Sequence, residues 1–207
     1  SRSPAAVALR AAPGTTGGGT SGGSDTSGTS GGSDTSGTIK YPFNLDGSSK
    51  VKAANGSAKL NGGIDVDFDL NSGTYEGDLT LNPTEGNFNI LGILKANAKI
   101  TYTPVGRTTG SLEDGKLVSN SNMIVKLPQI SIFGLPIGGG DKCQTAKPSA
   151  ITLTSTGPSF DPLKGGEIVG EYELAPLQGC GIFNDIISRY TAGPGNIISA
   201  TLTPKKS

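Results

Sequence analysis

From residue 39 onward, apolar and polar side chains alternate in short runs separated by turn residues. The clearest run covers residues 64–70, where Ile64, Val66 and Phe68 alternate with three aspartates. A period of two places every second side chain on the same face of an extended chain, so this run predicts a half-buried β-strand. A turn signal and a second alternating run at 74–81 follow, which predicts an antiparallel hairpin with one apolar and one acidic face.

The same alternation recurs along the chain, between dense Asn-Gly, Asp-Gly and Gly-rich turn signals. Strands are expected at residues 50–53, 96–102, 122–127, 170–174 and 198–203, and also near 39–45, 88–94, 130–135 and 150–156. This spacing predicts an all-β fold, either an antiparallel β-sandwich or a barrel of about eight to ten strands. One short helix is expected over residues 181–190, where apolar residues recur near the helical period.

The first 38 residues have a different composition. The segment TSGGSDTSG at residues 20–28 recurs at 29–37, and Gly, Ser, Thr and Asp dominate this part. Such a stretch buries too little apolar surface to offset the entropy of ordering. We therefore expect a disordered, flexible linker over residues 1–38 and a β-domain over residues 39–207.

Composition excludes several classes of function. The chain contains no His, which rules out Ser-His-Asp and Cys-His catalysis and every His-ligated metal site. Its 17 basic and 17 acidic residues give no net charge, whereas a general nucleic-acid binder needs a basic surface. No apolar run approaches the roughly 18 residues of a membrane span. We expect no cofactor, no transmembrane segment and no enzymatic activity.

Cys143 and Cys180 are the only cysteines. They are too few for a thiolate zinc site, and their spacing is not that of a C-x-x-C redox pair. In a Gly-rich chain with many loops, an even pair favours one disulfide and an oxidising compartment. Two buried free thiols in a cytosolic protein are the alternative.

The acidic face of the predicted hairpin has two interpretations. Asp65, Asp67 and Asp69 are weak candidates for a cation site, because clustered carboxylates are ligands that Ca²⁺ prefers. Alternate residues of a strand lie about 6.6–6.8 Å apart, however, which is too far for neighbouring side chains to share an ion easily. The other interpretation is a solvated face, paired with Lys50 and Lys52 on a neighbouring strand.

Two segments, at residues 88–94 and 127–140, are unusually apolar for this chain. They are interpreted either as ordinary buried strands or as the lining of an apolar pocket or docking patch. The candidate ligand- or partner-binding residues in them are Ile90, Ile130, Ile132, Phe133, Leu135 and Ile137.

Several short segments together resemble one group of proteins. These are Tyr41-Pro42-Phe43, Gly77-Asp78-Leu79-Thr80-Leu81-Asn82-Pro83, Thr109-Gly110-Ser111-Leu112, Pro162-Leu163-Lys164-Gly165-Gly166 and Gly193-Pro194-Gly195-Asn196. With the two cysteines, the pattern resembles uncharacterised secreted β-rich domains of actinobacteria, over about residues 39–204. The resemblance implies export and an extracellular or cell-envelope setting, and it carries over no site residue.

The expected function is therefore a non-catalytic secreted or cell-envelope module that binds a protein partner or an apolar, lipid ligand. The alternative is a structural or assembly subunit of a surface filament or envelope complex, in which the chain would self-associate. A converging set of polar residues in a cleft would instead favour an enzyme.

Removal of residues 1–38 tests the predicted division of the chain. Because a linker makes no packed contacts, the thermal midpoint of the remaining β-domain should equal that of the full chain. Circular dichroism melts of the two proteins provide the measurement. A large drop in the midpoint after truncation would contradict the linker assignment.

Overall fold

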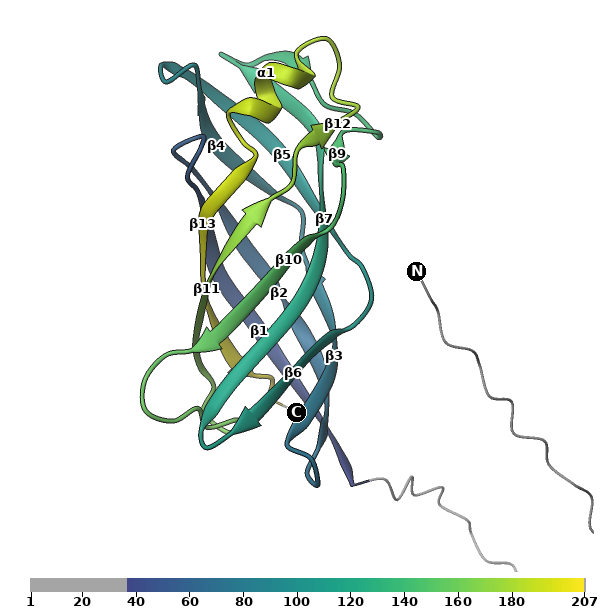
Figure 1. The fold of residues 1–207 in the computed structure, drawn as a ribbon, viewed down its shortest axis with the longest axis vertical. Helices are drawn as coiled ribbons and strands as arrows, with labels where there is room; N and C mark the ends of the chain where they lie inside the picture. The colour runs from purple at the N-terminus through teal and green to yellow at the C-terminus, as the bar shows by residue number, and fades with distance from the viewer. Residues whose placement is uncertain (1–36, 207) are drawn as a thin grey trace, which may run out of the picture. The chain divides into compact units, whose positions relative to one another are not determined.

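The alternating runs form strands whose apolar faces all point inward. The computed structural model describes residues 37–206, so the predicted linker lies outside the described residues except for Gly37 and Thr38, where β1 begins. The strands in this range are β1 (Thr38–Val51), β2 (Gly56–Asp69), β3 (Thr74–Leu81), β4 (Thr84–Ile90), β5 (Leu94–Pro104), β6 (Thr108–Glu113), β7 (Lys116–Ile132), β8 (Leu135–Gly138), β9 (Gln144–Thr145), β10 (Ser149–Ser155), β11 (Gly166–Leu174), β12 (Leu177–Gln178) and β13 (Gly193–Pro204). All of them pair antiparallel in one sheet, which closes into a barrel (Figure 1).

The barrel closes because β1 pairs on both sides. It pairs with β2 from Thr38↔Asp69 to Val51↔Gly56, and with β13 from Phe43↔Pro204 to Lys50↔Ile197. The strands around the barrel run β1-β13-β11-β10-β7-β5-β4-β2 and return to β1. The sequence prediction of an all-β antiparallel fold is thus confirmed, and of its two architectures the barrel is the one found.

Long strands β2 and β7 carry different partners at their two ends. Toward one end, β2 pairs with β4 and β7 pairs with β5. Toward the other end, β2 pairs with β3 and β7 pairs with β6, while β3 and β6 pair with each other. The wall between β2 and β7 is therefore completed by β4–β5 at one end and by β3–β6 at the other. The predicted hairpin at residues 64–81 is confirmed by the β2–β3 pairing, which ends at Asp69↔Thr74.

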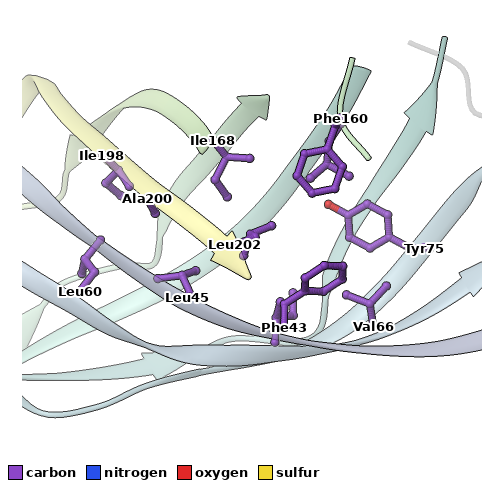
Figure 2. Packing of buried hydrophobic residues seen from close by; sticks show 12 residues of the cluster. Phe43, Leu45, Leu60, Val66, Tyr75, Phe160, Ile168, Ile198, Ala200 and Leu202 are labelled. Atoms are coloured by element: carbon purple, nitrogen blue, oxygen red, sulfur yellow. The ribbon is translucent and has the colours of Figure 1, made fainter. Parts of the chain in front are cut away.

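Inward-facing side chains form two apolar clusters, one in each half of the barrel. Figure 2 shows the cluster at the β3–β6 end, where Phe43, Leu45 and Val66 of β1 and β2 share one interior with Leu202 of the adjacent β13 and with Ile168 of β11. Glycines replace inward side chains where strands approach closely. At Gly62 an added Cβ would collide with the carbonyl oxygen of Thr80 on β3, so the close approach of β2 and β3 at this position requires glycine.

Both strongly apolar segments contain a tight turn. Residues 88–94 and 130–135 were each expected to contain one strand, but β4 ends at Ile90 and β7 at Ile132. The turns follow at Leu91-Gly92 and Phe133-Gly134, all four with positive φ. Asn or Asp is usual at such positions and apolar residues are uncommon there. Because Leu91 and Phe133 do not indicate a turn, the sequence pattern did not predict either turn.

One end of the barrel is covered by β9, β12, the helix α1 (Asn184–Arg189) and the Cys143–Cys180 disulfide, which we call the cap. We call this the cap end and the opposite end the open end. The helix is shorter than the expected 181–190, because Gly181 has φ +98° and cannot be helical. The Asn184 side chain accepts a hydrogen bond from Cys180 N–H and donates one to the Leu177 carbonyl, which fixes the helix to β12.

The disulfide joins two strand ends across the cap. Both sulfurs belong to residues with no exposed surface, and the two residues are 37 positions apart in the chain. The predicted Cys143–Cys180 bridge is therefore confirmed. The Leu127 N–H donates to the Cys143 carbonyl, and the Gly139 N–H donates to the Cys180 carbonyl. The bridge thus holds the cap against β7 and the segment that follows β8.

Replacement of both cysteines tests the contribution of this bridge. A loop of that length should stabilise the fold by about 3–4 kcal/mol through the entropy of the unfolded chain. We expect Cys143→Ala with Cys180→Ala to lower the free energy of unfolding by about that amount, measured by urea titration at neutral pH. An unchanged urea midpoint would show that the bridge contributes nothing to stability.

Candidate ligand-binding site

The interior of the barrel is not fully packed. In the open-end half, a cavity of about 340 Å³ lies among side chains from β1, β2, β3, β6, β7, β10, β11 and β13. Packed protein interiors rarely hold voids much larger than a water molecule, and ligand pockets begin at about 300 Å³. We call this space the lumen cavity. Residues that line it include Phe43, Leu45, Ile64, Val66, Phe68, Tyr75, Leu79, Leu112, Leu117, Leu153, Phe160, Ile168 and Leu202.

The lumen cavity reaches the surface at the open end. Its lining includes Ile39, Leu70 and Leu163, whose exposures are 42%, 59% and 76%. These residues belong to the start of β1, the β2–β3 turn and the β10–β11 loop. An apolar channel with exposed apolar residues at its rim is thus open to a ligand from this end.

The β10–β11 loop partly covers that entrance. Phe160 from this loop is buried inside the barrel, and its N–H donates to the Gly115 carbonyl of the β6–β7 turn. The Asp161 carboxylate accepts a hydrogen bond from the Leu163 N–H, which keeps Leu163 at the rim. The loop therefore places one aromatic ring in the barrel and one aliphatic side chain at its edge.

A second, smaller cavity of about 80 Å³ lies in the cap-end half. Ala58, Ile100 and Met123 line it from the barrel wall, while Leu177 and Ile187 cover it from the cap. Ile187 is the buried residue of α1. The cap thus bounds the barrel interior at the end opposite the lumen entrance.

The interior carries hydroxyl groups but almost no charge. Ser49 and Tyr172 share a hydrogen bond of 2.7 Å, and Thr108 and Ser121 share another of the same length. The Tyr75 hydroxyl donates to the Val118 carbonyl. Among the described residues that line the two cavities, Asp161 at the rim is the sole carboxylate, and no Lys or Arg is present.

Burial raises the pKa of three tyrosines in this interior. For Tyr75 and Tyr172, loss of hydration of the phenolate is the main cause, and hydrogen bonds from Ser119 and Ser49 oppose it. For Tyr102, burial is again the main cause, and the neighbouring Tyr172 raises the pKa further. These phenols remain neutral over the whole physiological range, so the interior is a neutral surface.

The candidate residues from the sequence divide between the interior and the surface. Ile90 and Ile130 are buried and line the smaller cavity, and Ile132 and Ile137 pack half-buried against the same cluster. Phe133 and Leu135 are exposed beyond the end of β7. A bulge in the β5–β7 pairing, between Lys99 and Thr101, changes which face of β7 points inward.

The larger cavity was not identified from the sequence. Its walls come from the inward faces of ordinary alternating strands, such as Phe43 and Leu45 on β1 and Val66 on β2. Alternation shows that these faces are buried but cannot show whether the space between them is filled. Two features of the sequence could have indicated the cavity: the large number of strands, which favours a closed barrel, and glycines such as Gly62 on inward-facing positions.

The acidic face of the β2–β3 hairpin is organised by one cation. Arg107 contacts carboxylate oxygens of Asp67, Glu76 and Asp78 at 2.6, 3.0 and 3.0 Å. Hydrogen bonding to Arg107 holds the pKa of Asp67 below its usual range. Within residues 37–206, no group of three or more Asp, Glu or Cys residues is arranged to hold a metal ion.

The partner of this face is thus Arg107, not the Lys50 and Lys52 considered in the solvated interpretation. Asp69 instead accepts a hydrogen bond from the Asn71 N–H in the β2–β3 turn. Asp67 faces Lys40 across the β1–β2 pair, and Lys40 also favours the carboxylate form of Asp67.

No helix in residues 37–206 is both long enough and apolar enough to cross a membrane. Comparison with protein-family models, with curated proteins and with solved structures found no match. A function must therefore be inferred from the barrel and its interior.

Tyr102 offers a test of the buried phenols. In the unfolded chain a tyrosine ionises near pH 10, whereas the buried phenol keeps its proton to higher pH. Its contribution to stability is complete below about pH 10 and is lost as the pH rises above that value. Tyr102→Phe should therefore leave the urea midpoint nearly unchanged at neutral pH and reduce its fall in alkali. Parallel midpoint–pH curves for the two proteins would contradict this assignment.

Proposed function

We propose that this barrel is a non-catalytic binding protein that holds the apolar chain of a lipid or related amphiphile in its lumen, in an extracellular or cell-envelope setting. The observation that supports this most strongly is the lumen cavity of about 340 Å³, which is lined by apolar side chains and reaches the open end. A cavity with a mostly apolar lining favours apolar ligands, because few polar groups are present to hold water in it.

The neutrality of the interior supports a specific orientation of the ligand. A buried charge without a partner is unfavourable, and no Lys or Arg lines either cavity within the described residues. We infer that the hydrocarbon chain enters first and that any charged headgroup stays at the open end, near Ile39, Leu70 and Leu163. A neutral ester or hydroxyl group is compatible with a deeper position, where Ser and Tyr hydroxyls are available.

The proposed setting rests on two further features. A fully buried disulfide is typical of proteins that fold in an oxidising compartment. The resemblance of the strand and turn segments to secreted actinobacterial domains points in the same direction. In such a setting, a barrel with an enclosed lumen would shield a poorly soluble chain from water.

The experiment is a titration of the full chain with a fluorescent polyene fatty acid. We expect saturable binding of one equivalent and an increase in the thermal midpoint with ligand concentration. Leu79→Trp, which adds an indole to the wall of the lumen cavity, should weaken this binding by about tenfold or more. The matched control is Leu135→Trp, since Leu135 is 69% exposed and lies outside the cavity lining.

The control should bind the fatty acid within about twofold of the unaltered chain. Because the chain has no Trp, each variant carries a single indole, and its emission reports whether the side chain is in an apolar environment. Non-saturable binding, or an equal loss of affinity in both variants, would contradict a ligand in the lumen.

A further inference from the structure

The cap end carries the largest group of exposed apolar side chains in the described part of the chain. Ile93 in the β4–β5 turn is 82% exposed, Phe133 after β7 is 79% exposed, and Ile182 before α1 is 91% exposed. Leu91, Leu135 and Ile186, from the same three segments, are also exposed. None of these residues lines either of the two interior cavities.

Strand pairing brings the three segments to one end of the barrel. The β5–β7 register, with Ala96 opposite Ile132, places the β4–β5 turn beside the β7–β8 turn. At Gly138, at the end of β8, an added Cβ would lie 3.4 Å from a side-chain carbon of Ile187 in α1. Figure 1 shows both turns and α1 at the same end, opposite the turn that joins β2 to β3. The exposed side chains thus form a set of separate projections, which we call the apolar tips.

Two of the apolar tips occupy backbone positions that disfavour them. Leu91 has φ +56° and Phe133 has φ +52°, and each precedes a glycine that also has positive φ. The β6–β7 turn, at the open end, has the same geometry but carries Asp114, with φ +51°, before its glycine. Asn and Asp tolerate this conformation best, so Leu91 and Phe133 make their turns less stable than Asn or Asp would. A strained apolar residue that faces solvent points to a role in binding.

The charges around the apolar tips are mostly positive. The turns, the cap and the adjoining strand residues at the cap end, residues 52–55, 91–95, 133–134, 139–148 and 173–192, carry five basic and three acidic residues. The basic residues are Lys52, Lys95, Lys142, Lys147 and Arg189, and the acidic residues are Asp141, Glu173 and Asp185. The acidic β2–β3 hairpin lies toward the other end of the barrel. A negatively charged surface would therefore attract the cap end.

We propose that the cap end docks onto the interface of an anionic lipid bilayer, with the apolar tips inserted among the headgroups and the lysines in contact with lipid phosphates. Separate projecting side chains fit a fluid interface, which closes around each of them, better than a rigid partner that needs a continuous matching surface. The lumen entrance would then face away from the bilayer. This inference rests on a different surface from the lumen and stands or falls independently of ligand binding.

The test is co-sedimentation of the full chain with vesicles of phosphatidylglycerol and phosphatidylcholine in equal parts. We expect binding at low ionic strength that weakens with added salt, and much weaker binding to vesicles of phosphatidylcholine alone. Leu91→Asn combined with Phe133→Asn should lower the partition coefficient by about tenfold or more. Its thermal midpoint should be unchanged or higher, because Asn is favoured at positive φ.

The matched control is Val105→Asn combined with Ile197→Asn, which removes two exposed apolar side chains that belong neither to the apolar tips nor to the lining of either cavity. Its vesicle binding should stay within about twofold of the unaltered chain. Three results of the vesicle assay would overturn the proposal: no binding to anionic vesicles at low salt, an equal loss in the control, or no loss in Leu91→Asn with Phe133→Asn. The proposal would also fail if the unaltered chain self-associated without lipid and Leu91→Asn with Phe133→Asn abolished this association. The apolar tips would then be a contact between two copies of the chain. Binding of the polyene fatty acid in the Leu91→Asn, Phe133→Asn variant shows that the lumen is intact.

Discussion

The pairing of β1 with both β2 and β13 is the interaction on which the rest of the structure depends. A sheet of these strands would otherwise present two long edges with unpaired backbone N–H and C=O groups. Closure satisfies them and forces every inward side chain to share one interior. The apolar faces of the strands then need no second sheet or covering helix. The interior volume is set by the number and tilt of the strands, and the side chains do not have to fill it completely.

The two ends of the barrel interior differ in accessibility, because different segments of the chain lie over them. At the cap end, a disulfide-linked layer of short strands and α1 covers the barrel, and Ile187 points into the space beneath it and lines the smaller cavity. At the open end, a single loop inserts Phe160 and leaves apolar residues exposed at the rim. The buried polar side chains are hydroxyls and the Asn196 amide, and they mostly bond to each other or to the backbone. An apolar, neutral interior with one sealed and one accessible end is the physical basis of the proposed ligand orientation.

Much of this fold follows from sequence pattern, and the remainder depends on contacts between distant segments. Alternation identified parts of most long strands, the acidic hairpin face and its buried partner face, because each depends on neighbours two positions apart. It did not identify β6, and it divided the continuous strand β1 into two. The disulfide followed from cysteine number. The turns at Leu91-Gly92 and Phe133-Gly134 were missed, since apolar residues occupy positions where Asn or Asp would have marked them. Barrel closure, the role of Arg107 and the lumen cavity all join residues far apart in the chain, and no local pattern encodes them.

The β1–β13 contact also has a consequence for how the molecule is made. These two strands lie more than a hundred residues apart, yet each supplies half of a ladder that seals the wall. A ribosome or a secretion channel that releases the chain from its N-terminus delivers β13 after all the other strands. Until the segment up to Pro204 emerges, β1 has an open edge and the interior is exposed to water. Such a molecule cannot mature gradually during synthesis or export. Before that point the strands can form only an open sheet with an exposed apolar face, and the wall closes when β13 pairs with β1.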